Sequence, residues 1–541
     1  MGENMANQIE LLDCTLRDGS YINGSDFGVP AIKGIIKKMQ DAHADIIECG
    51  WLKDKAYAEG SAYYHLPSDM EQYLTDKRKD VTYVVMIDWD RYNLDQLPVY
   101  DGKSLDAIRV VFPHGKHREG IEVGEKIRAK GYKVYLQAAN TLSYSNEDLH
   151  DLALAINKFR PEGLSIVDTF GAMYFEDLER IATILDFYVQ KDIRLGFHSH
   201  NNMQLSFALT IHFINLMKAR DRGVIVDSSL CGMGRGAGNA TTELVAGYLN
   251  RNEHGNYDMN SILDAIDMYM EEFSEKYTWG YSTPYFISGM YQTHVNNVAY
   301  LLKNHRANSR DMRNIFASLG VEERRHYDYD LLENKYLENQ GRIVDDSGEI
   351  SGISEKLKGR EVLLLAPGRS IIEDEARIKR FIEERHPVVI GVNAYNSAYQ
   401  YDYLFFTNSI RYDYAKEVYG DKIKDIQRIL LSNITTEAEP GEHIINFNSV
   451  IKRGWEHFDN AMILCLRFID RLRIPEICIA GFDGFKKAYN ESYADSSLPT
   501  LNPEGKWDEL NDEVRDMYRD FKASVEGKIK ITFLTESYFN E

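Results

Sequence analysis

Eight short apolar segments recur between residues 9 and 230, and their number constrains the fold more than any other feature of the chain. The segments are IELLDC (9–14), DIIECG (45–50), VTYVVMI (81–87), AIRVVF (107–112), KVYLQAA (133–139), GLSIVD (163–168), IRLGFHSH (193–200) and VIVDSSL (224–230). Amphipathic stretches such as 30–43 and 147–159 separate most of them. Eight strands with helices between them predict a closed parallel (β/α)8 barrel, a TIM barrel, with an open doubly wound sheet as the alternative.

The chain of 541 residues is too long for one ordinary core. Residues 255–340 are rich in Met, Tyr, Glu and Asn and predict helices that extend the barrel domain. The predicted helices cover 259–277, 285–305 and 309–320. The polar stretch 339–360 is the predicted linker.

An α/β pattern restarts after this linker. Its strand candidates are EVLLLAPGRSI (361–371), VVIGVN (388–393), DYLFFTN (402–408), QRILLSN (427–433) and EICIAGFDGF (476–485). About five strands with helices between them predict a separate Rossmann-like α/β domain. The predicted division is therefore a barrel domain over 1–255, a helical extension over 256–338, a linker over 339–360 and a C-terminal domain over 361–541.

The composition limits which binding partners and which cellular compartment we expect for this protein. The formal net charge is −21 with scattered acidic residues, which disfavours nucleic acid and anionic membranes but permits small anionic substrates. The five cysteines form no CxxC pair, which favours a reducing cytoplasm over a disulfide framework. The N-terminus has no signal-peptide pattern, and no uncharged apolar run reaches 18 residues. We expect a cytoplasmic protein.

The sequence HSHNN (198–202) ends the seventh strand candidate and suggests a metal site. Histidines at i and i+2 on a strand, His198 and His200, point to the same side and can reach one ion. Asp18, just after the first strand, lies on the same face of a closed barrel and supplies the carboxylate that such sites use. An isolated HxH is more often a pair of hydrogen-bonded surface histidines.

Two further strand ends carry polar residues where barrel enzymes place their chemistry. DCTLRDGSY (13–21) follows the first strand, and VDTFG (167–171) places Asp168 and Thr169 at the sixth as candidate substrate contacts. Arg17 is suited to bind a substrate carboxylate or stabilise an enolate oxygen. Its alternative is an ion pair with Glu48, which would still place it in the site.

The motifs DCTLRDG, IECG, VDTFG, HSHNN and CGMGRGAGNATTE (231–243), in this order, resemble the DRE-TIM metallolyase superfamily over roughly residues 8–300. That superfamily includes 4-hydroxy-2-oxovalerate aldolase, hydroxymethylglutaryl-CoA lyase, isopropylmalate and homocitrate synthases, and the carboxyltransferase domain of pyruvate carboxylase. The resemblance implies that Asp18, His198 and His200 bind a divalent metal, Mn²⁺ or Mg²⁺ first and Co²⁺ or Zn²⁺ as alternatives. It also implies that Arg17 stabilises the enolate and that Glu48 belongs to the site. The glycine-rich stretch resembles the superfamily's loop after strand eight; a flexible glycine turn is the alternative.

Within the superfamily, residues 279–289 (WGYSTPYFISG) are similar to a stretch of the hydroxy-ketoacid aldolases that contributes an active-site tyrosine. The resemblance assigns this role to Tyr285, with a core aromatic residue as the alternative. In the hydroxyvalerate aldolases, a histidine three residues after the metal aspartate is the catalytic base; here that position is Tyr21. A tyrosine with a pKa near ~10 is a poor base at neutral pH. Either the metal or Arg17 assists Tyr21, or another group such as His114 takes the role.

The predicted function is a metal-dependent aldolase or lyase. It would form or break a carbon–carbon bond between the enolate of a 2-oxo acid, such as pyruvate, and an aldehyde. We also expect a homo-oligomer, which is typical of such aldolases. An acyl-CoA-dependent condensing enzyme of the same superfamily is the nearest alternative. A non-catalytic binding or scaffold protein is a further one.

The C-terminal domain gives a second set of candidates. Its strand ends are similar to those of sialyltransferase family 42 and the related 6-hydroxymethylpterin pyrophosphokinase-like proteins, and a helix N-terminus after a glycine loop can bind an anion. The resemblance implies a nucleotide or nucleotide-sugar ligand at Gly368, Ser370, Asn393, Asn408 and Asp483. The alternatives are an inactive scaffold, a dimerisation domain, or a glycosyl- or nucleotidyltransferase that is the main catalyst and takes its substrate from the barrel.

Overall fold

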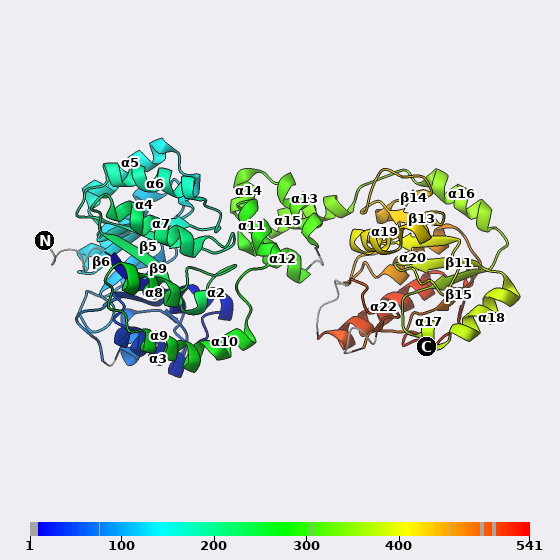
Figure 1. Cartoon of the computed structure of the whole chain (residues 1–541), viewed down its shortest axis with the longest axis horizontal. Coiled ribbons are helices and arrows are strands. Elements are labelled where there is room, and N and C mark those ends of the chain that lie inside the picture. The colour runs from blue at the N-terminus through cyan, green and yellow to red at the C-terminus, as the bar shows by residue number, and fades with distance from the viewer. Residues whose placement is uncertain are drawn as a thin grey trace. The chain divides into compact units, whose positions relative to one another are not determined.

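The computed structural model describes residues 9–74, 76–304, 307–455, 457–486, 492–499 and 505–540. The chain divides into two compact units (Figure 1). The first unit comprises residues 1–298 with 321–326, and the second comprises 299–320 with 327–541. The domain boundaries inferred from the sequence stay a prediction.

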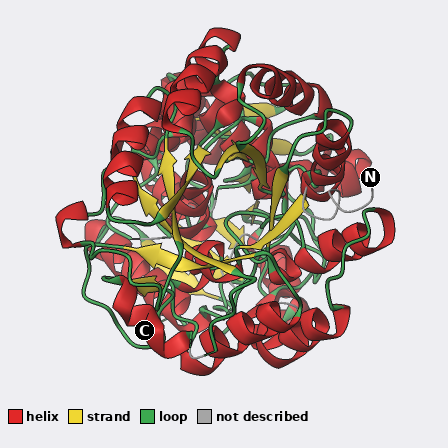
Figure 2. Cartoon of the chain, turned by 90° about the vertical axis from the view of Figure 1, so that its left-hand side faces the viewer, coloured by secondary structure: helices red, strands yellow, loops and turns green. Residues whose placement is uncertain are grey.

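Eight parallel strands of the first unit close into a barrel, as the sequence predicts. They are β1 (Ile9–Asp13), β2 (Ile46–Leu52), β4 (Thr82–Asp88), β5 (Ala107–Phe112), β6 (Lys133–Ala138), β7 (Gly163–Asp168), β8 (Arg194–Ser199) and β9 (Val224–Ser228). The order is β1-β9-β8-β7-β6-β5-β4-β2, and pairing of β1 with β2 closes the ring. The two-residue strand β3 (Tyr63–Tyr64) adds to β2. Figure 2 shows the strands curving around a centre with helices outside them.

Amphipathic helices cover the outside of this barrel because each buries one apolar stripe. They are α3 (Val29–Asp41), α4 (His117–Ala129), α5 (Asn146–Phe159), α6 (Phe175–Tyr188), α7 (Ser206–Lys218) and α8 (Thr242–Asn252). Helix α5 illustrates the local rules: Ser145 and Asp148 form a capping box at its start, and Arg160 ends it in the left-handed conformation.

Side-chain alternation along the strands decides what fills the barrel. Apolar residues form the floor of the interior; they include Leu12, Ile46, Val84, Ala107, Tyr135 and Ile225. Two residues further along their strands, Glu48, Arg109 and Asp227 share this inward face because the period of a strand is two. All three are at most 1% exposed. A polar layer therefore lies directly above an apolar floor, toward the carboxyl ends of the strands.

Short helices follow the barrel. They are α9 (Met259–Ala265), the π-turn Ile266–Met270, α10 (Glu271–Lys276), α11 (Thr283–Met290), α12 (Val295–Asn304), α13 (Ser309–Ser318), α14 (Val321–Arg325) and α15 (Tyr329–Gln340). The single helix predicted over 285–305 is wrong, because it breaks between α11 and α12. Gln292 takes a positive φ of 49° there, and Ser288 Oγ donates to the Thr293 carbonyl. Among the described residues no helix is both long and apolar enough to cross a membrane.

The second unit contains a seven-stranded parallel sheet. Its strands are β10 (Val362–Leu365), β11 (Val388–Val392), β12 (Tyr403–Phe406), β13 (Gln427–Leu431), β14 (Glu442–Ile445), β15 (Glu476–Ala480) and β16 (Lys530–Phe533). The order β14-β13-β12-β11-β10-β15-β16 reverses its direction of growth between β10 and β15. All five predicted strands are present, and the sequence missed β14 and β16. Both are short, and β16 alternates exposed and half-buried residues at the sheet edge.

Helices α16 (Ser347–Leu357), α17 (Ser370–Glu373), α18 (Glu375–Arg385), α19 (Ser409–Ile423), α20 (Ala461–Arg471) and α22 (Trp507–Ser524) accompany this sheet. Helix α16 falls within the stretch 339–360, and its Ile353 and Leu357 are buried in the core of the second unit. The strands β10, β11, β12 and β15 all end at one edge of the sheet.

Candidate metal centre and active site

Asp18, His198 and His200 come together at the carboxyl end of the barrel. Asp18 ends the short helix α1 (Thr15–Asp18) that follows β1, and His198 and His200 stand at the end of β8. All three are buried, and their ligand atoms lie within 4.8 Å of one another. One carboxylate and two imidazoles at this spacing form a donor set suited to a divalent transition metal.

Hydrogen bonds orient both imidazoles by their Nδ1 atoms. His198 Nδ1 lies 3.1 Å from Asp227 Oδ2, and His200 Nδ1 lies 3.3 Å from the Gly238 carbonyl oxygen. Donation from Nδ1 leaves the lone pair of Nε2 available, which is the usual arrangement of a metal-ligating histidine.

The protonation states of the cluster also suit a metal. Burial lowers the pKa of His200 to about 4, against the opposing effect of the Asp18 carboxylate. Burial acts to raise the pKa of Asp18, but Arg17 and the two histidines overcome it and hold the pKa below its usual range. At neutral pH the cluster therefore presents an ionised carboxylate and a neutral His200.

Arg17 lies beside the cluster in a network of buried charges. Its Nε is 2.7 Å from Glu48 Oε2, and its Nη1 is 2.5 Å from Asp18 Oδ1. The alternative anticipated from the sequence, an Arg17–Glu48 ion pair, is therefore present and keeps Arg17 in the site. Arg109 extends the network, with Nη1 2.9 Å from Glu48 Oε2 and Nη2 2.6 Å from Asp227 Oδ2.

The charge balance of this network fits a bound cation. Its three carboxylates, Asp18, Glu48 and Asp227, outnumber the guanidinium groups of Arg17 and Arg109 and leave a net charge of −1. Buried oxygens without a hydrogen-bond partner add to the deficit; among them are Glu48 Oε1, Asp227 Oδ1 and Asn239 Oδ1. Since buried charge is expensive without a counter-ion, a cation would stabilise the site.

Asn239 is a site residue that the sequence reasoning did not single out. Its Nδ2 lies 2.5 Å from Asp18 Oδ2, and its Oδ1 is buried without a partner. The two ends of an amide have the same shape, so Asn239 can turn its oxygen toward Asp18 when a cation lies between them. Its position in the glycine-rich stretch 231–243 was the only available signal.

The glycine-rich stretch itself packs against the cluster. A Cβ atom at Gly234 would lie 2.6 Å from Asp18 Oδ2 and 2.3 Å from Asn239 Nδ2. Only a residue without a side chain allows this backbone to approach the carboxylate so closely. The loop is therefore a tightly packed wall of the site.

Tyr21, on α2 (Ser20–Asn23), lies next to Arg235 of the same glycine-rich loop. The Arg235 guanidinium is 4.7 Å from the centre of the Tyr21 ring, and Trp51 packs edge-on at 5.8 Å. Desolvation raises the pKa of the Tyr21 hydroxyl, against the opposing effects of Arg235 and Arg17. Tyr21 is 46% exposed overall, and like an unperturbed tyrosine it is a neutral phenol at neutral pH.

His114 and Tyr285 do not join the cluster through any hydrogen bond or ring contact among the described residues. His114 Nε2 lies 3.1 Å from Asp148 Oδ2 at the start of α5, and its ring packs on Tyr144. Tyr285 stands in the first turn of α11, where burial raises the pKa of its hydroxyl.

Asp168 and Thr169 both hold neighbouring loops. The Asp168 carboxylate accepts hydrogen bonds from the backbone N–H groups of Ala172 and Met173, at 2.9 and 3.1 Å. Burial nevertheless raises the pKa of Asp168 to about 6. Thr169 Oγ1 accepts from the Asn140 N–H at 2.7 Å. Any substrate contact of these two side chains would compete with these bonds.

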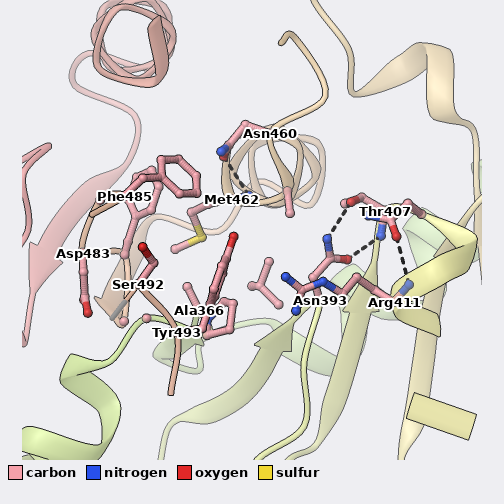
Figure 3. Close-up of a pocket in the computed structure, with 18 of the residues that line it drawn as sticks. Ala366, Asn393, Thr407, Arg411, Asn460, Met462, Asp483, Phe485, Ser492 and Tyr493 are labelled. Carbon is pink, nitrogen blue, oxygen red and sulfur yellow. Dashed lines mark hydrogen bonds between the residues drawn. The ribbon is translucent and has the colours of Figure 1, made fainter. Parts of the chain in front are cut away.

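The five C-terminal candidates lie at the carboxyl edge of the second sheet. Asp483 accepts hydrogen bonds from both the N–H and the Oγ of Ser370, at 2.7 and 2.5 Å. Asn393 exchanges two hydrogen bonds with Thr407, and Asn408 caps α19. Gly368, Asn393, Asn408 and Asp483 line one pocket (Figure 3), and Ser370 adjoins it through its hydrogen bonds to Asp483.

Comparisons with known proteins agree on the first unit. Residues 116–268 match the family model described as HMGL-like. An oxaloacetate decarboxylase of Mycobacterium tuberculosis is 29% identical over 264 residues, which cover 47% of this chain and 74% of the relative. A 4-hydroxy-2-oxovalerate aldolase of Moorella thermoacetica is 24% identical over 330 residues, 58% of this chain and 92% of the relative. Among solved structures, the hydroxymethylglutaryl-CoA lyase of Pseudomonas aeruginosa aligns with a TM-score of 0.39 and 17% identity, over 50% of this chain and 94% of the lyase.

Proposed function

Since the barrel of this chain belongs to the DRE-TIM metallolyase superfamily, we propose that it is a divalent-metal-dependent aldolase or lyase acting on a 2-oxo acid. The reaction breaks or forms the carbon–carbon bond next to the keto group and passes through an enolate. The observation that carries the proposal is the buried cluster of Asp18, His198 and His200, with Arg17 held 2.5 Å from Asp18.

Asp18, His198 and His200 would hold the metal, with Asn239 as a fourth ligand. The charge deficit of the buried network and the unpartnered Asn239 oxygen support this set. A bound Mn²⁺ or Mg²⁺ supplies Lewis-acid polarisation of the substrate's keto and carboxylate oxygens. Asp227 orients His198 through its Nδ1 and thereby sets the direction of the Nε2 lone pair.

Arg17 stabilises the enolate in this proposal. Among the described residues, the hydrogen bonds of its guanidinium involve Nε and Nη1, and Nη2 would donate to a substrate oxygen. Glu48 and Asp18 fix the guanidinium before substrate arrives. A donor fixed in advance stabilises developing negative charge without further reorganisation, and removal of one such donor typically costs about 100- to 1,000-fold in rate.

Tyr21 acts as a proton donor in this proposal. A tyrosine phenol is protonated at neutral pH, and desolvation raises the pKa of Tyr21 further, so its O–H suits the return of a proton to the enolate carbon. In aldol cleavage, a separate base must first remove the proton of the substrate hydroxyl.

Decarboxylation of a 2-oxo acid that bears a carboxylate on carbon 3 is the second candidate, and the state of Tyr21 favours it. Loss of CO₂ leaves the electron pair of the broken bond in the enolate, and the Tyr21 O–H then supplies the proton to carbon 3. No base is needed in this reaction. The relative from Mycobacterium tuberculosis carries the name oxaloacetate decarboxylase.

Proton exchange at carbon 3 of pyruvate tests the enolate directly. In D₂O with Mn²⁺, the protein should exchange these protons, Arg17→Ala should lose at least about 100-fold in rate, and the surface variant Lys37→Ala should match the wild type. Lys37 forms only an exposed pair with Asp41. Release of pyruvate from oxaloacetate or from 4-hydroxy-2-oxovalerate then separates the two candidates. A wild-type protein that neither exchanges pyruvate nor releases it from either substrate contradicts the proposal.

A further inference from the structure

The second unit contains a pocket that the barrel chemistry does not use. It has about 960 Å³ of free space, including its open mouth. Residues that follow β10, β11, β12 and β15 line it. The sheet reverses its strand order between β10 and β15, and open parallel sheets bind ligands outside the strand ends at such a reversal.

Arg411 supplies a positive charge inside this pocket. It is the third residue of α19, is 7% exposed, and extends its side chain from the helix into the pocket (Figure 3). Its Nη1 atom is buried and has no hydrogen-bond partner in the described part of the chain. The guanidinium carbon lies 5.1 Å from the centre of the Tyr493 ring. A buried cation without an acceptor is unfavourable unless a ligand supplies one.

Two acidic residues also line the pocket, Asp459 and Asp483, and among the described residues neither forms an ion pair with Arg411. Asp483 instead accepts hydrogen bonds from Ser370 on both oxygens. The N-terminus of the 15-residue helix α19, capped by Asn408, adds the positive end of a helix dipole at the same place. Both features favour an anionic group.

The pocket also carries apolar side chains, some of them next to the polar Asp483 and Ser492 (Figure 3). They are Met462, Phe482, Phe485 and Phe539, whereas the Tyr493 ring lies beside Arg411. Figure 3 places Phe485 and Met462 on one side of the pocket and Asn393, Thr407 and Arg411 on the other. The two halves together fit a molecule with a flat apolar body and an anionic end, because aromatic walls stack on planar groups.

We propose that this pocket binds a small organic anion with a planar ring, its anionic group against Arg411 and the N-terminus of α19 and its ring against Phe485 and Met462. Phosphate esters of nucleosides and aromatic carboxylates share this chemistry. Every residue that lines this pocket belongs to the second unit.

Isothermal titration of the full chain tests this site with CMP, UMP, AMP, benzoate and inorganic phosphate. At least one ring-bearing anion should bind, and Arg411→Gln should weaken it at least tenfold. Arg385→Gln should bind as the wild type does, because Arg385 forms only an exposed pair with Glu361. The nucleotides and benzoate distinguish a phosphate from a carboxylate as the anionic group.

A second variant tests the other half of the pocket. Phe485→Ala should weaken the ring-bearing anion while leaving any binding of inorganic phosphate unchanged. Asp18→Asn in the barrel should not alter either affinity, which separates failure here from failure of the barrel proposal. Absence of binding by every named probe, or equal affinity in the wild type and Arg411→Gln, would overturn the proposal.

Discussion

The mouth of the barrel and the C-terminal pocket both lie at the carboxyl ends of parallel strands, yet their buried arginines differ. In the barrel, Arg17 and Arg109 each pair with two carboxylates, and negative charge is left over. In the pocket, Arg411 forms no ion pair with a described residue, and its Nη1 atom is buried without a hydrogen-bond partner. The fold determines where a ligand can lie, whereas the buried groups that lack a partner determine which charge the ligand should carry. One edge therefore suits a cation and the other an anion.

Substitution of a buried arginine by glutamine in each region should give the largest difference in stability between the two regions. Arg109→Gln leaves Glu48 and Asp227 buried without their shared counter-ion, which should destabilise the barrel by about 3–5 kcal/mol. Arg411→Gln removes no pair and should leave the second unit as stable as before, or more so. Hydrogen exchange followed by mass spectrometry reports each unit separately. Equal destabilisation by both variants would abolish the distinction.

Tyr21→Phe tests the chemistry of the barrel site alone, because it removes a proton donor without changing the charge of the barrel network. We expect pyruvate formation to slow at least about 100-fold because a positioned acid contributes roughly that much, while affinity for Mn²⁺ stays unchanged. Tyr100→Phe is the matched control, since its hydroxyl bonds Asp106 at the surface. Steady-state assays with oxaloacetate measure the effect, and full activity in Tyr21→Phe would exclude the phenol from the chemistry.

Asp227→Asn tests the carboxylate that orients His198. Loss of such a partner lowers metal affinity about 10- to 100-fold, and Mn²⁺ titration should show a loss of this size. Asp41→Asn, in an exposed pair with Lys37, should bind Mn²⁺ normally. Unchanged affinity in a folded Asp227→Asn protein would mean that Asp227 serves Arg109 alone.

Addition of metal should stabilise one region only, and this is the smallest expected effect. At Mn²⁺ concentrations about ten times the Kd, the barrel should gain about 1.4 kcal/mol, while the second unit should gain nothing. Denaturant titrations followed by hydrogen exchange can resolve the two units. Equal stabilisation of both would place the ion elsewhere.

Much of the barrel site could be predicted because its ligands belong to short motifs at strand ends. RDG and HSH each place a ligand type directly after an apolar strand, so Asp18, His198 and His200 could be found from local pattern. Arg109 and Asp227 were missed because they lie inside strands, where an inward-facing ion pair leaves no local signature. Asn239 was hidden among the glycines of its loop, although its backbone packs against Asp18.

The C-terminal pocket was less predictable for a different reason. Asn393 and Asn408 follow predicted strands, but their side chains hold Thr407 and the start of α19. Arg411 stands out because no described carboxylate pairs with it, and the lack of a partner cannot be predicted from a sequence pattern. Strand β16 was missed because edge strands are short and half polar.

Titration of the purified, chelator-treated protein with Mn²⁺ tests the central claim most directly. The wild type should bind one ion per chain at the Asp18, His198 and His200 cluster, and Asp18→Asn should lose at least about 100-fold in affinity through loss of a ligand. Binding of Mn²⁺ should restore proton exchange at carbon 3 of pyruvate in the wild type. A wild type that takes up no ion, or an Asp18→Asn variant that binds Mn²⁺ as tightly, would contradict the assignment of this cluster as the metal centre.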